Sequence, residues 1–227
     1  MHGFTDSAFR LKCRRAGADA VYSEMVAAEA IIRLVPKALE MIKFQKEERP
    51  IVIQIFGTSP SSMAKAARII EKKFRPDGID INFGCPVQKA AKQGFGAIQT
   101  QNPAQASAIV RAVSRATTLP VSVKTRLSDK TAKKSGDFVE LMFQSGAKLV
   151  AIHGRTPTQK YRGSADWEIL HEIKKRLKDK TILGSGDIRC VQDLKEKIGN
   201  LDGALIGRAA KRDPKIFAKL KKIKVGR

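Results

Sequence analysis

Short runs of Val, Ile and Leu recur along the chain, separated by longer stretches in which apolar residues return every three or four positions. Most of these runs do not alternate with polar residues, which is typical of strands buried on both faces of a parallel sheet. The pattern predicts seven strands, at residues 20–23, 51–56, 78–82, 121–124, 149–153, 181–184 and 203–206.

The stretches between these strands have the period of amphipathic helices. Thr5-Asp6-Ser7 reads as a helix N-cap, and Gly17 and Gly146 stand where helices are expected to end. A repeat of about 25–30 residues is typical of a (β/α)8 TIM barrel. The sequence therefore predicts an α/β protein, a single barrel domain over residues 1–227 that lacks the first strand. An open doubly wound sheet is the alternative, but no early GxGxxG motif supports it. Further helices are predicted at 59–73, 103–116, 131–145, 167–177, 191–198 and 214–223.

The chain is strongly basic, with 44 Lys and Arg against 22 Asp and Glu and a net charge of +22. Such a charge favours an anionic partner, nucleic acid first, and a solvated lysine-rich surface is the alternative. Cys13, Cys85 and Cys190 show neither CxxC metal spacing nor a disulfide framework, so we expect no metal site and a cytoplasmic location. No apolar run approaches the roughly 20 residues of a membrane span.

Cys85 is the most informative residue, because it follows a predicted strand within Asn82-Phe83-Gly84-Cys85-Pro86. Loops at the carboxyl ends of parallel strands carry the chemistry of α/β proteins. A free thiol is mostly protonated near neutral pH, so Cys85 is a candidate proton donor or nucleophile. A small buried hydrophobic residue is the alternative, and it is our prediction for Cys13 and Cys190, which fall in predicted helices.

Polar residues follow the other strands as well. Gln54 suits the mixed donor and acceptor edge of a heterocycle, Lys124 can hold negative charge on a ring or enolate, and His153 can bond the ring or orient another group. In barrels, the loops after the last two strands commonly bind a phosphate, which predicts a phosphorylated ligand here. The residues in these two loops are Ser185, Gly186, Asp187, Gly207 and Arg208.

Several long motifs resemble the tRNA-dihydrouridine synthases, which are FMN-dependent TIM-barrel enzymes. The most specific are DGIDINFGCPVQKAAKQGFGA at 77–97 and HGRTPTQKYRGSADW at 153–167. Shorter matches are VKTRL at 123–127, GSGDI at 184–188 and IGRAAKRDPKIF at 206–217. The resemblance covers essentially the whole chain. Relative to the family pattern, however, the sequence starts inside the first motif, without the first barrel strand, and ends before the C-terminal helical domain.

The resemblance implies reduction of uridine in tRNA to 5,6-dihydrouridine, with FMN as cofactor and NADPH or NADH as reductant. The target base is flipped out, carbon 6 receives hydride, and Cys85 protonates carbon 5. Asn82 and Arg155 fall where the family faces the uracil or the flavin edge. The family pattern places the flavin against Met1, Gln54, Lys124, His153, Ser185, Gly186, Asp187, Gly207 and Arg208.

Two other functions remain open from the sequence alone. One is an FMN oxidoreductase that acts on a free pyrimidine or enone, and the other is a non-catalytic RNA-binding remnant. Residues 89–92 follow the cysteine and are candidates for contact with RNA phosphates. We expect Tyr161 and Trp167 to be packing residues rather than platforms for base stacking. The sequence predicts no oligomeric state.

Overall fold

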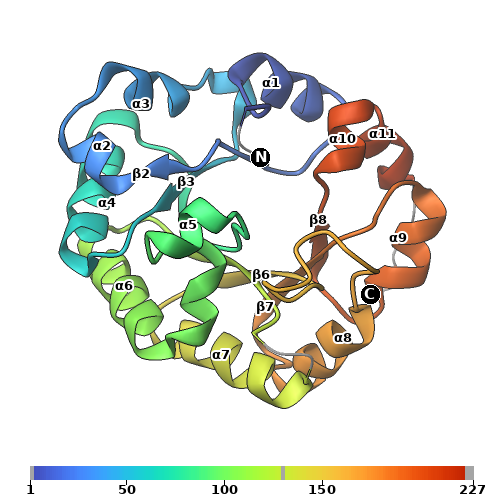
Figure 1. Ribbon diagram of the computed structural model, residues 1–227. Helices are drawn as coiled ribbons and strands as arrows, with labels where there is room; N and C mark the ends of the chain where they lie inside the picture. The colour runs from blue at the N-terminus through green and yellow to red at the C-terminus, as the bar shows by residue number, and fades with distance from the viewer. Residues whose placement is uncertain (1–2, 129–130, 223–227) are drawn as a thin grey trace.

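A curled parallel sheet forms the centre of the protein, and helices surround it (Figure 1). The computed structural model describes residues 3–128 and 131–222. The eight-stranded sheet has the order β1-β3-β4-β5-β6-β7-β8, and β2 pairs with β3 beside this path. The strands are β1 Val21–Tyr22, β2 Val26–Ala27, β3 Ile51–Phe56, β4 Gly78–Phe83, β5 Val121–Arg126, β6 Leu149–His153, β7 Thr181–Ser185 and β8 Gly203–Leu205.

Helices form a ring outside the sheet, while α5 lies over its centre in the end-on view (Figure 1). The α-helices are α1 Ser7–Arg15, α2 Ala28–Ile32, α3 Pro36–Met41, α4 Pro60–Phe74, α5 Gln88–Lys92, α6 Pro103–Ala116, α7 Ala132–Gln144, α8 Trp167–Arg176, α9 Val191–Ile198, α10 Arg208–Arg212 and α11 Ile216–Lys221. Two 3-10 helices, η1 Lys46–Glu48 and η2 Gly96–Gln101, complete the described elements.

The predicted α/β barrel is confirmed, and all seven predicted strands form at their expected places. Every strand pair is parallel. Within the described residues no pairing joins β8 to β1, so the barrel is incomplete along that seam. The prediction also missed four short elements, which show no clear hydrophobic period: β2, α2, α3 and α10.

The core follows from the strand sequences. Ile53, Ile81, Val123 and Val150 lie on neighbouring strands and are 0% exposed. Burial on both faces explains why these strands lack polar alternation. On the outside, α4 begins after the N-cap Ser59, whose side chain accepts from the Ser62 amide, with proline in its first turn. The core fixes the strands, so their carboxyl ends project side chains from a rigid base.

The N-terminal segment is held by polar contacts. Asp6 caps α1, as predicted, by accepting a hydrogen bond from the amide of Phe9 at 2.8 Å. Glu24, in the loop after β1, accepts from the amides of Gly3 at 2.8 Å and Thr5 at 3.2 Å. These bonds keep the start of the described chain at the mouth of the barrel. Met1 lies outside the described residues.

The two cysteines predicted to be buried differ. Cys13 is buried in α1, and burial raises the pKa of its thiol to about 11. Cys190 is exposed at the N-cap of α9, so the prediction of a buried residue is wrong there. A helix start leaves backbone N–H groups facing solvent and favours a polar cap, which the hydrophobic period alone did not reveal. No described helix is long and apolar enough to cross a membrane.

Candidate functional site

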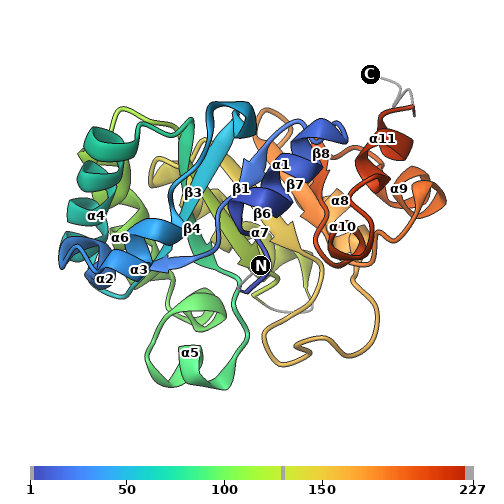
Figure 2. The same cartoon turned by 90° about the horizontal axis from the view of Figure 1, so that it is seen from above.

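Two loops project from the carboxyl ends of the strands and stand on the same side of the sheet (Figure 2). One leads from β4 through α5 and carries Cys85. The other joins β6 to α8 and covers residues 154–166. The start of the described chain, at residue 3, lies between them in this view (Figure 2). The predicted site residues that the structure describes belong to these strand ends and the loops that follow, which is where barrel enzymes carry out their chemistry.

The Cys85 loop has a fixed backbone. The Asn82 side chain accepts hydrogen bonds from the amides of Gly84 at 3.1 Å and Cys85 at 3.0 Å. The carbonyl of Cys85 in turn accepts from the amide of Ala97 at 2.9 Å. Gly96 has φ +75°, and a Cβ there would lie 2.7 Å from the Cys85 carbonyl oxygen. The close return of the chain therefore requires glycine and holds the partly buried thiol at one place.

Lys124 lies beside this loop on the neighbouring strand, where its backbone is in register with Asn82. The residue is half-buried, and no described residue forms a hydrogen bond or ion pair with its buried ammonium group. Burial lowers its pKa, the negative charge of Asp80 opposes that shift, and Arg126 adds to it. A buried cation without a partner is costly, and an electron-rich ligand would offset this cost.

His153 is the last residue of β6, the strand that pairs with β5 on the side away from β4. Its Nδ1 lies 3.4 Å from the Ser185 hydroxyl, and its Nε2 lies 3.4 Å from an Arg155 guanidinium nitrogen. Burial, together with the positive charges of Lys124, Arg126 and Arg155, lowers the pKa of His153 to about 3. The imidazole is therefore neutral at physiological pH, and it can donate or accept a hydrogen bond without adding charge.

Arg155 and Asp187 form a buried ion pair of 2.7 Å. Arg155 also donates to the carbonyls of Arg162 at 3.2 Å and Gly163 at 2.5 Å, so its guanidinium group holds the 154–166 loop closed. Asp187 accepts from the amide of Ala165 at 2.8 Å. Although burial raises the pKa of Asp187, the Ala165 amide and Arg155 outweigh it and keep that pKa below its ordinary value.

The predicted phosphate-binding residues gather beside this pair. Gly186 has φ +124°, and a Cβ there would approach the Cβ of Ala165 to 2.6 Å, so the chain passes too closely for a side chain. Gly207 precedes α10, which begins at Arg208. The exposed Arg208 uses one nitrogen to bind Asp187 at 3.0 Å. Its remaining donors are available for an anion, because no other acceptor contacts them among the described residues.

Arg126 and Asp80 are buried near the site, although neither is among its predicted residues. Arg126 donates to the carbonyls of Gly84 at 2.9 Å and Lys160 at 2.8 Å, and so connects the two projecting loops. Asp80 binds the Gln54 side chain at 2.7 Å. Arg126 comes directly after Lys124-Thr125 at a strand end, a position that could have indicated it.

Tyr161 in the second loop and Trp167, the first residue of α8, also differ from one another. Trp167 is buried and donates to the carbonyl of Gly186 at 3.1 Å, so the predicted packing role is confirmed. Tyr161 is 63% exposed, and its ring lies 5.6 Å from the guanidinium carbon of Arg126 and 5.9 Å from that of Arg208. The prediction of a packing residue is wrong for Tyr161, because the loop carries its ring away from the core.

The donor set at the barrel mouth fits a phosphorylated flavin. It combines an unpartnered ammonium group on Lys124, a neutral imidazole on His153, a close-approach glycine at Gly186 and available guanidinium donors on Arg208. Together they offer positive charge both to an electron-rich ring and to a phosphate. In the described part of the chain, no group of three or more His, Cys, Asp or Glu is arranged to hold a metal ion.

A parallel barrel with polar groups gathered at its strand ends defines an enzyme of the β/α-barrel class. The family model of the dihydrouridine synthases matches residues 1–227, and the chain belongs to this family of flavin-dependent oxidoreductases. A probable tRNA-dihydrouridine synthase of Aquifex aeolicus is 37% identical, over 97% of this chain and 71% of that protein. One from Mycobacterium tuberculosis is 36% identical, over 97% of this chain and 60% of that protein.

Solved structures support the fold alone. A 2-naphthoyl-CoA reductase in complex with 2-naphthoyl-CoA superposes with a TM-score of 0.68 at 12% identity, covering 96% of this chain and 46% of the reductase. An aldolase, QR15, superposes with a TM-score of 0.60 at 17% identity, covering 95% of this chain and 87% of the aldolase. The β/α-barrel architecture is thus shared with proteins of little sequence similarity.

Proposed function

We propose that the chain is the barrel domain of a tRNA-dihydrouridine synthase, which uses FMN and either NADPH or NADH to reduce a uridine of tRNA to 5,6-dihydrouridine. The observation that carries this proposal is the fixed position of Cys85. Its amide is held 3.0 Å from the Asn82 side chain, and Asn82 is in register with the unpartnered Lys124. The names of the relatives in Aquifex aeolicus and Mycobacterium tuberculosis support the substrate.

Bound FMN would supply the hydride that carbon 6 of the uracil receives. The residues proposed to hold it are Gln54, Lys124 and His153 at the ring, and Ser185, Gly186, Asp187, Gly207 and Arg208 along the ribityl chain and phosphate. Met1 is proposed to lie against the ring. The neutral His153 offers a hydrogen bond there without adding to the positive charge of Lys124.

The proton for carbon 5 comes from the Sγ of Cys85 in this proposal. Reduction of the C5–C6 double bond adds one hydride and one proton, so the thiol is left as a thiolate and regains its proton from solvent. Lys124 stabilises the negative charge that builds up as the ring is reduced. Asn82 and Arg155 are proposed to position the uracil, Arg155 chiefly by holding the 154–166 loop closed.

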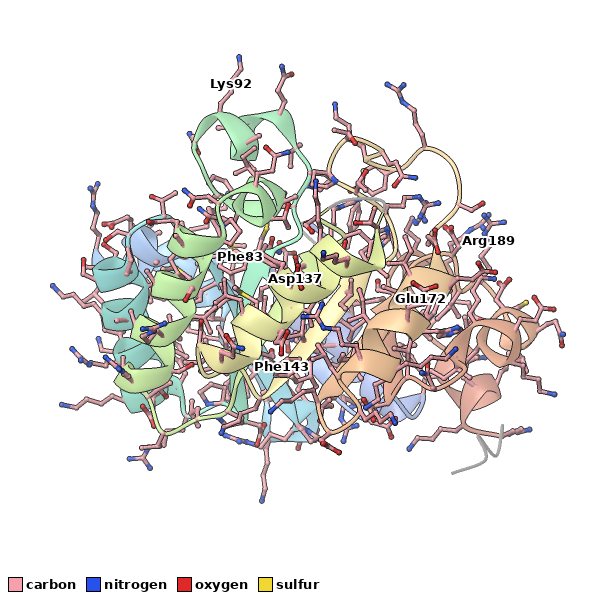
Figure 3. The ribbon with its side chains drawn as sticks, turned by 90° about the horizontal axis from the view of Figure 1, so that it is seen from below. Phe83, Lys92, Asp137, Phe143, Glu172 and Arg189 are labelled. Atoms are coloured by element: carbon pink, nitrogen blue, oxygen red, sulfur yellow. The ribbon has the colours of Figure 1, made fainter. Side chains whose placement is uncertain are left out.

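The proposed partner is tRNA, bound without a membrane, in the cytoplasm. A stacked uridine cannot reach Cys85, so the base has to be flipped into the mouth of the barrel. Lys92 points away from the body of the protein at the tip of the α5 loop, where it can meet a phosphate (Figure 3). The net charge of +22 favours binding of the RNA backbone and should make that binding weaken with salt.

Replacement of Cys85 by Ala tests the proposal. We expect dihydrouridine formation on unmodified tRNA to fall about 100-fold or more, because the proton donor is lost. The flavin absorption band and its bleaching by anaerobic NADPH should remain. Cys190→Ser is the matched control, since it changes an exposed thiol far along the chain, and it should retain activity. Full activity of Cys85→Ala would show that the proton comes from another group.

A further inference from the structure

A continuous chain of side-chain hydrogen bonds runs from the middle of the sheet to Cys85. Ser122 donates to Asp80 Oδ1 at 2.6 Å, and Gln54 Nε2 donates to Asp80 Oδ2 at 2.7 Å. Asn82 Nδ2 then donates to Gln54 Oε1 at 2.8 Å. Asn82 Oδ1 accepts from the amide of Cys85 at 3.0 Å. The strands β3, β4 and β5, which are hydrogen-bonded neighbours, carry these side chains.

The groups at the two ends of this hydrogen-bond chain fix which amide groups donate and which accept along it. The amide of Cys85 can only donate, so Asn82 must present its oxygen there and its nitrogen to Gln54. The Asp80 carboxylate can only accept, so Gln54 must present its nitrogen there and its oxygen to Asn82. Each amide group in the middle is thus oriented from both sides.

We propose that Asp80 is a positioning residue, whose carboxylate sets the amide orientations of Gln54 and Asn82 and through them holds the backbone of Cys85. The inference deepens the proposed function and rests on it, since it concerns the same thiol. Asp80 touches neither Cys85 nor the mouth of the barrel and acts through the two amides.

Burial makes this dependence strict. Asp80 is 0% exposed, Asn82 7% and Gln54 8%, so water cannot replace a lost partner at little cost. Burial raises the pKa of Asp80 to about 6, against the hydrogen bonds from Ser122 and Gln54 and the positive charge of Lys124. The carboxyl group is therefore an acceptor at the pH of the experiment below, near 8.

Replacing Asp80 by Leu removes the acceptor at one end and keeps a side chain of similar size. The Gln54 nitrogen then has no partner, and the Gln54 amide is free to turn. When it turns, its nitrogen faces the nitrogen of Asn82, and Asn82 can separate the two donors only by turning away from the amides of Gly84 and Cys85. Asp80→Asn is the control for charge, because its amide oxygen can still accept from Gln54 while the Ser122 hydroxyl turns to accept from its nitrogen.

A second change restores the direction. In the double variant Asp80→Leu/Gln54→Glu, the carboxylate moves to position 54, where no unpaired amide nitrogen is left. That carboxylate accepts from Asn82, whose oxygen again receives the amide of Cys85. The double variant keeps the same charge as the parent and places it one strand away. A role in packing alone would not be repaired by a second substitution of this kind.

The test measures how fast iodoacetamide alkylates Cys85 in the folded full-length chain at pH 8. The background is Cys190→Ser, which removes the exposed thiol and keeps a helix cap, while Cys13 is buried. Mass spectrometry of the modified peptide identifies Cys85 as the site. Circular dichroism melting verifies that each variant is folded. Ser122→Ala is the matched control, because it removes a hydrogen bond to Asp80 without turning either amide.

We expect Asp80→Leu to raise the alkylation rate about fivefold or more, since the loop loses two backbone hydrogen bonds. The double variant, Asp80→Asn and Ser122→Ala should each stay within about twofold of the parent. If Asp80→Leu matches the parent, or the double variant behaves like Asp80→Leu, the proposal is overturned. If Asp80→Leu does not fold, the double variant decides: the parental rate supports the proposal, and failure to fold or a raised rate overturns it.

The readout uses neither tRNA nor a reductant, so it separates this inference from the proposed function. If the alkylation pattern is as expected but Cys85→Ala keeps full activity, the positioning role stands and the proton-donor assignment fails. If Cys85→Ala is inactive but Asp80→Leu leaves alkylation unchanged, the proposed function stands and the role of Asp80 fails.

Discussion

The middle of the sheet and the N-terminal quarter of the chain are stabilised in different ways. Strands β3, β4 and β5 have six residues each and bury Ile53, Ile81 and Val123 completely. Residues 3–50 contain only the two-residue strands β1 and β2, and the groups buried there include Arg10 and Glu48. Both regions bury apolar side chains, but residues 3–50 also depend on the buried ion pair of Arg10 and Glu48.

This difference matters because apolar packing and buried ion pairs respond differently to a substitution. Apolar packing has little directional preference, so a small change in one side chain removes only a small part of the stabilisation. A buried ion pair works only with both partners present, and removal of one leaves an uncompensated charge. The region without long strands is therefore expected to be the more sensitive to a single substitution.

Glu48→Ala should have the largest effect on stability. Glu48 binds Arg10 at 2.5 Å, Ser7 at 2.5 Å and the amide of Gln45 at 2.9 Å, and both members of the ion pair are almost completely buried. Loss of the carboxylate should lower the free energy of unfolding by about 3–5 kcal/mol. Urea unfolding followed by circular dichroism measures this change.

Glu40→Ala provides the control on the same part of the chain. Glu40 pairs with Lys43 at 2.6 Å, but their side chains are 69% and 63% exposed. An exposed pair contributes roughly 0–1 kcal/mol, so this variant should be close to the parent. If Glu48→Ala costs no more than Glu40→Ala, the buried pair does not hold the N-terminal quarter.

The same contrast explains what the sequence could predict. Unbroken apolar runs are local signals, so every long strand was predicted within a few residues of its bounds. Short elements such as α2 and α3 carry no periodic signal, and they owe their place to packing against the rest of the fold. Strand β2 has only two residues and pairs with β3, which no local pattern reveals.

The candidate site also contains residues that the sequence could predict and residues that it could not. Cys85, Lys124 and His153 were found because polar residues after apolar strands are visible in the sequence. Asp80 was not assigned a role, because its partners Gln54 and Ser122 are 26 and 42 residues away. No local pattern pairs residues so far apart, and only the sheet register brings them together.

His153 gives the second prediction, at the end of β6, where burial and three neighbouring cations disfavour a further positive charge. Its pKa is about 3 in the folded protein, below the ordinary value of 6.5, so the unfolded chain binds the proton first. Stability is therefore complete above pH 6.5 and is lost as the pH falls from 6.5 towards 3, by up to about 1.4 kcal/mol per pH unit from this group.

His153→Gln should remove this contribution, since Gln does not titrate. Urea unfolding of the parent and the variant at pH 7, 6 and 5 gives the two slopes, and the variant should have the smaller one. Equal slopes would mean that the folded site accepts a proton on His153 after all. Other titrating groups do not confuse the comparison, because both proteins share them.

Two matched substitutions have the smallest expected effect and make the comparison most direct. Ile53 in β3 and Ile31 in α2 are both 0% exposed, and Ile→Val removes one methylene group from each. Each should lower the free energy of unfolding by about 1 kcal/mol.

Native-state hydrogen exchange should distinguish the two variants, because a region held by its own contacts can open alone. Ile53→Val should speed exchange in all the long strands, and Ile31→Val only within residues 3–50. If both variants speed exchange equally everywhere, the N-terminal quarter and the sheet open as one cooperative unit.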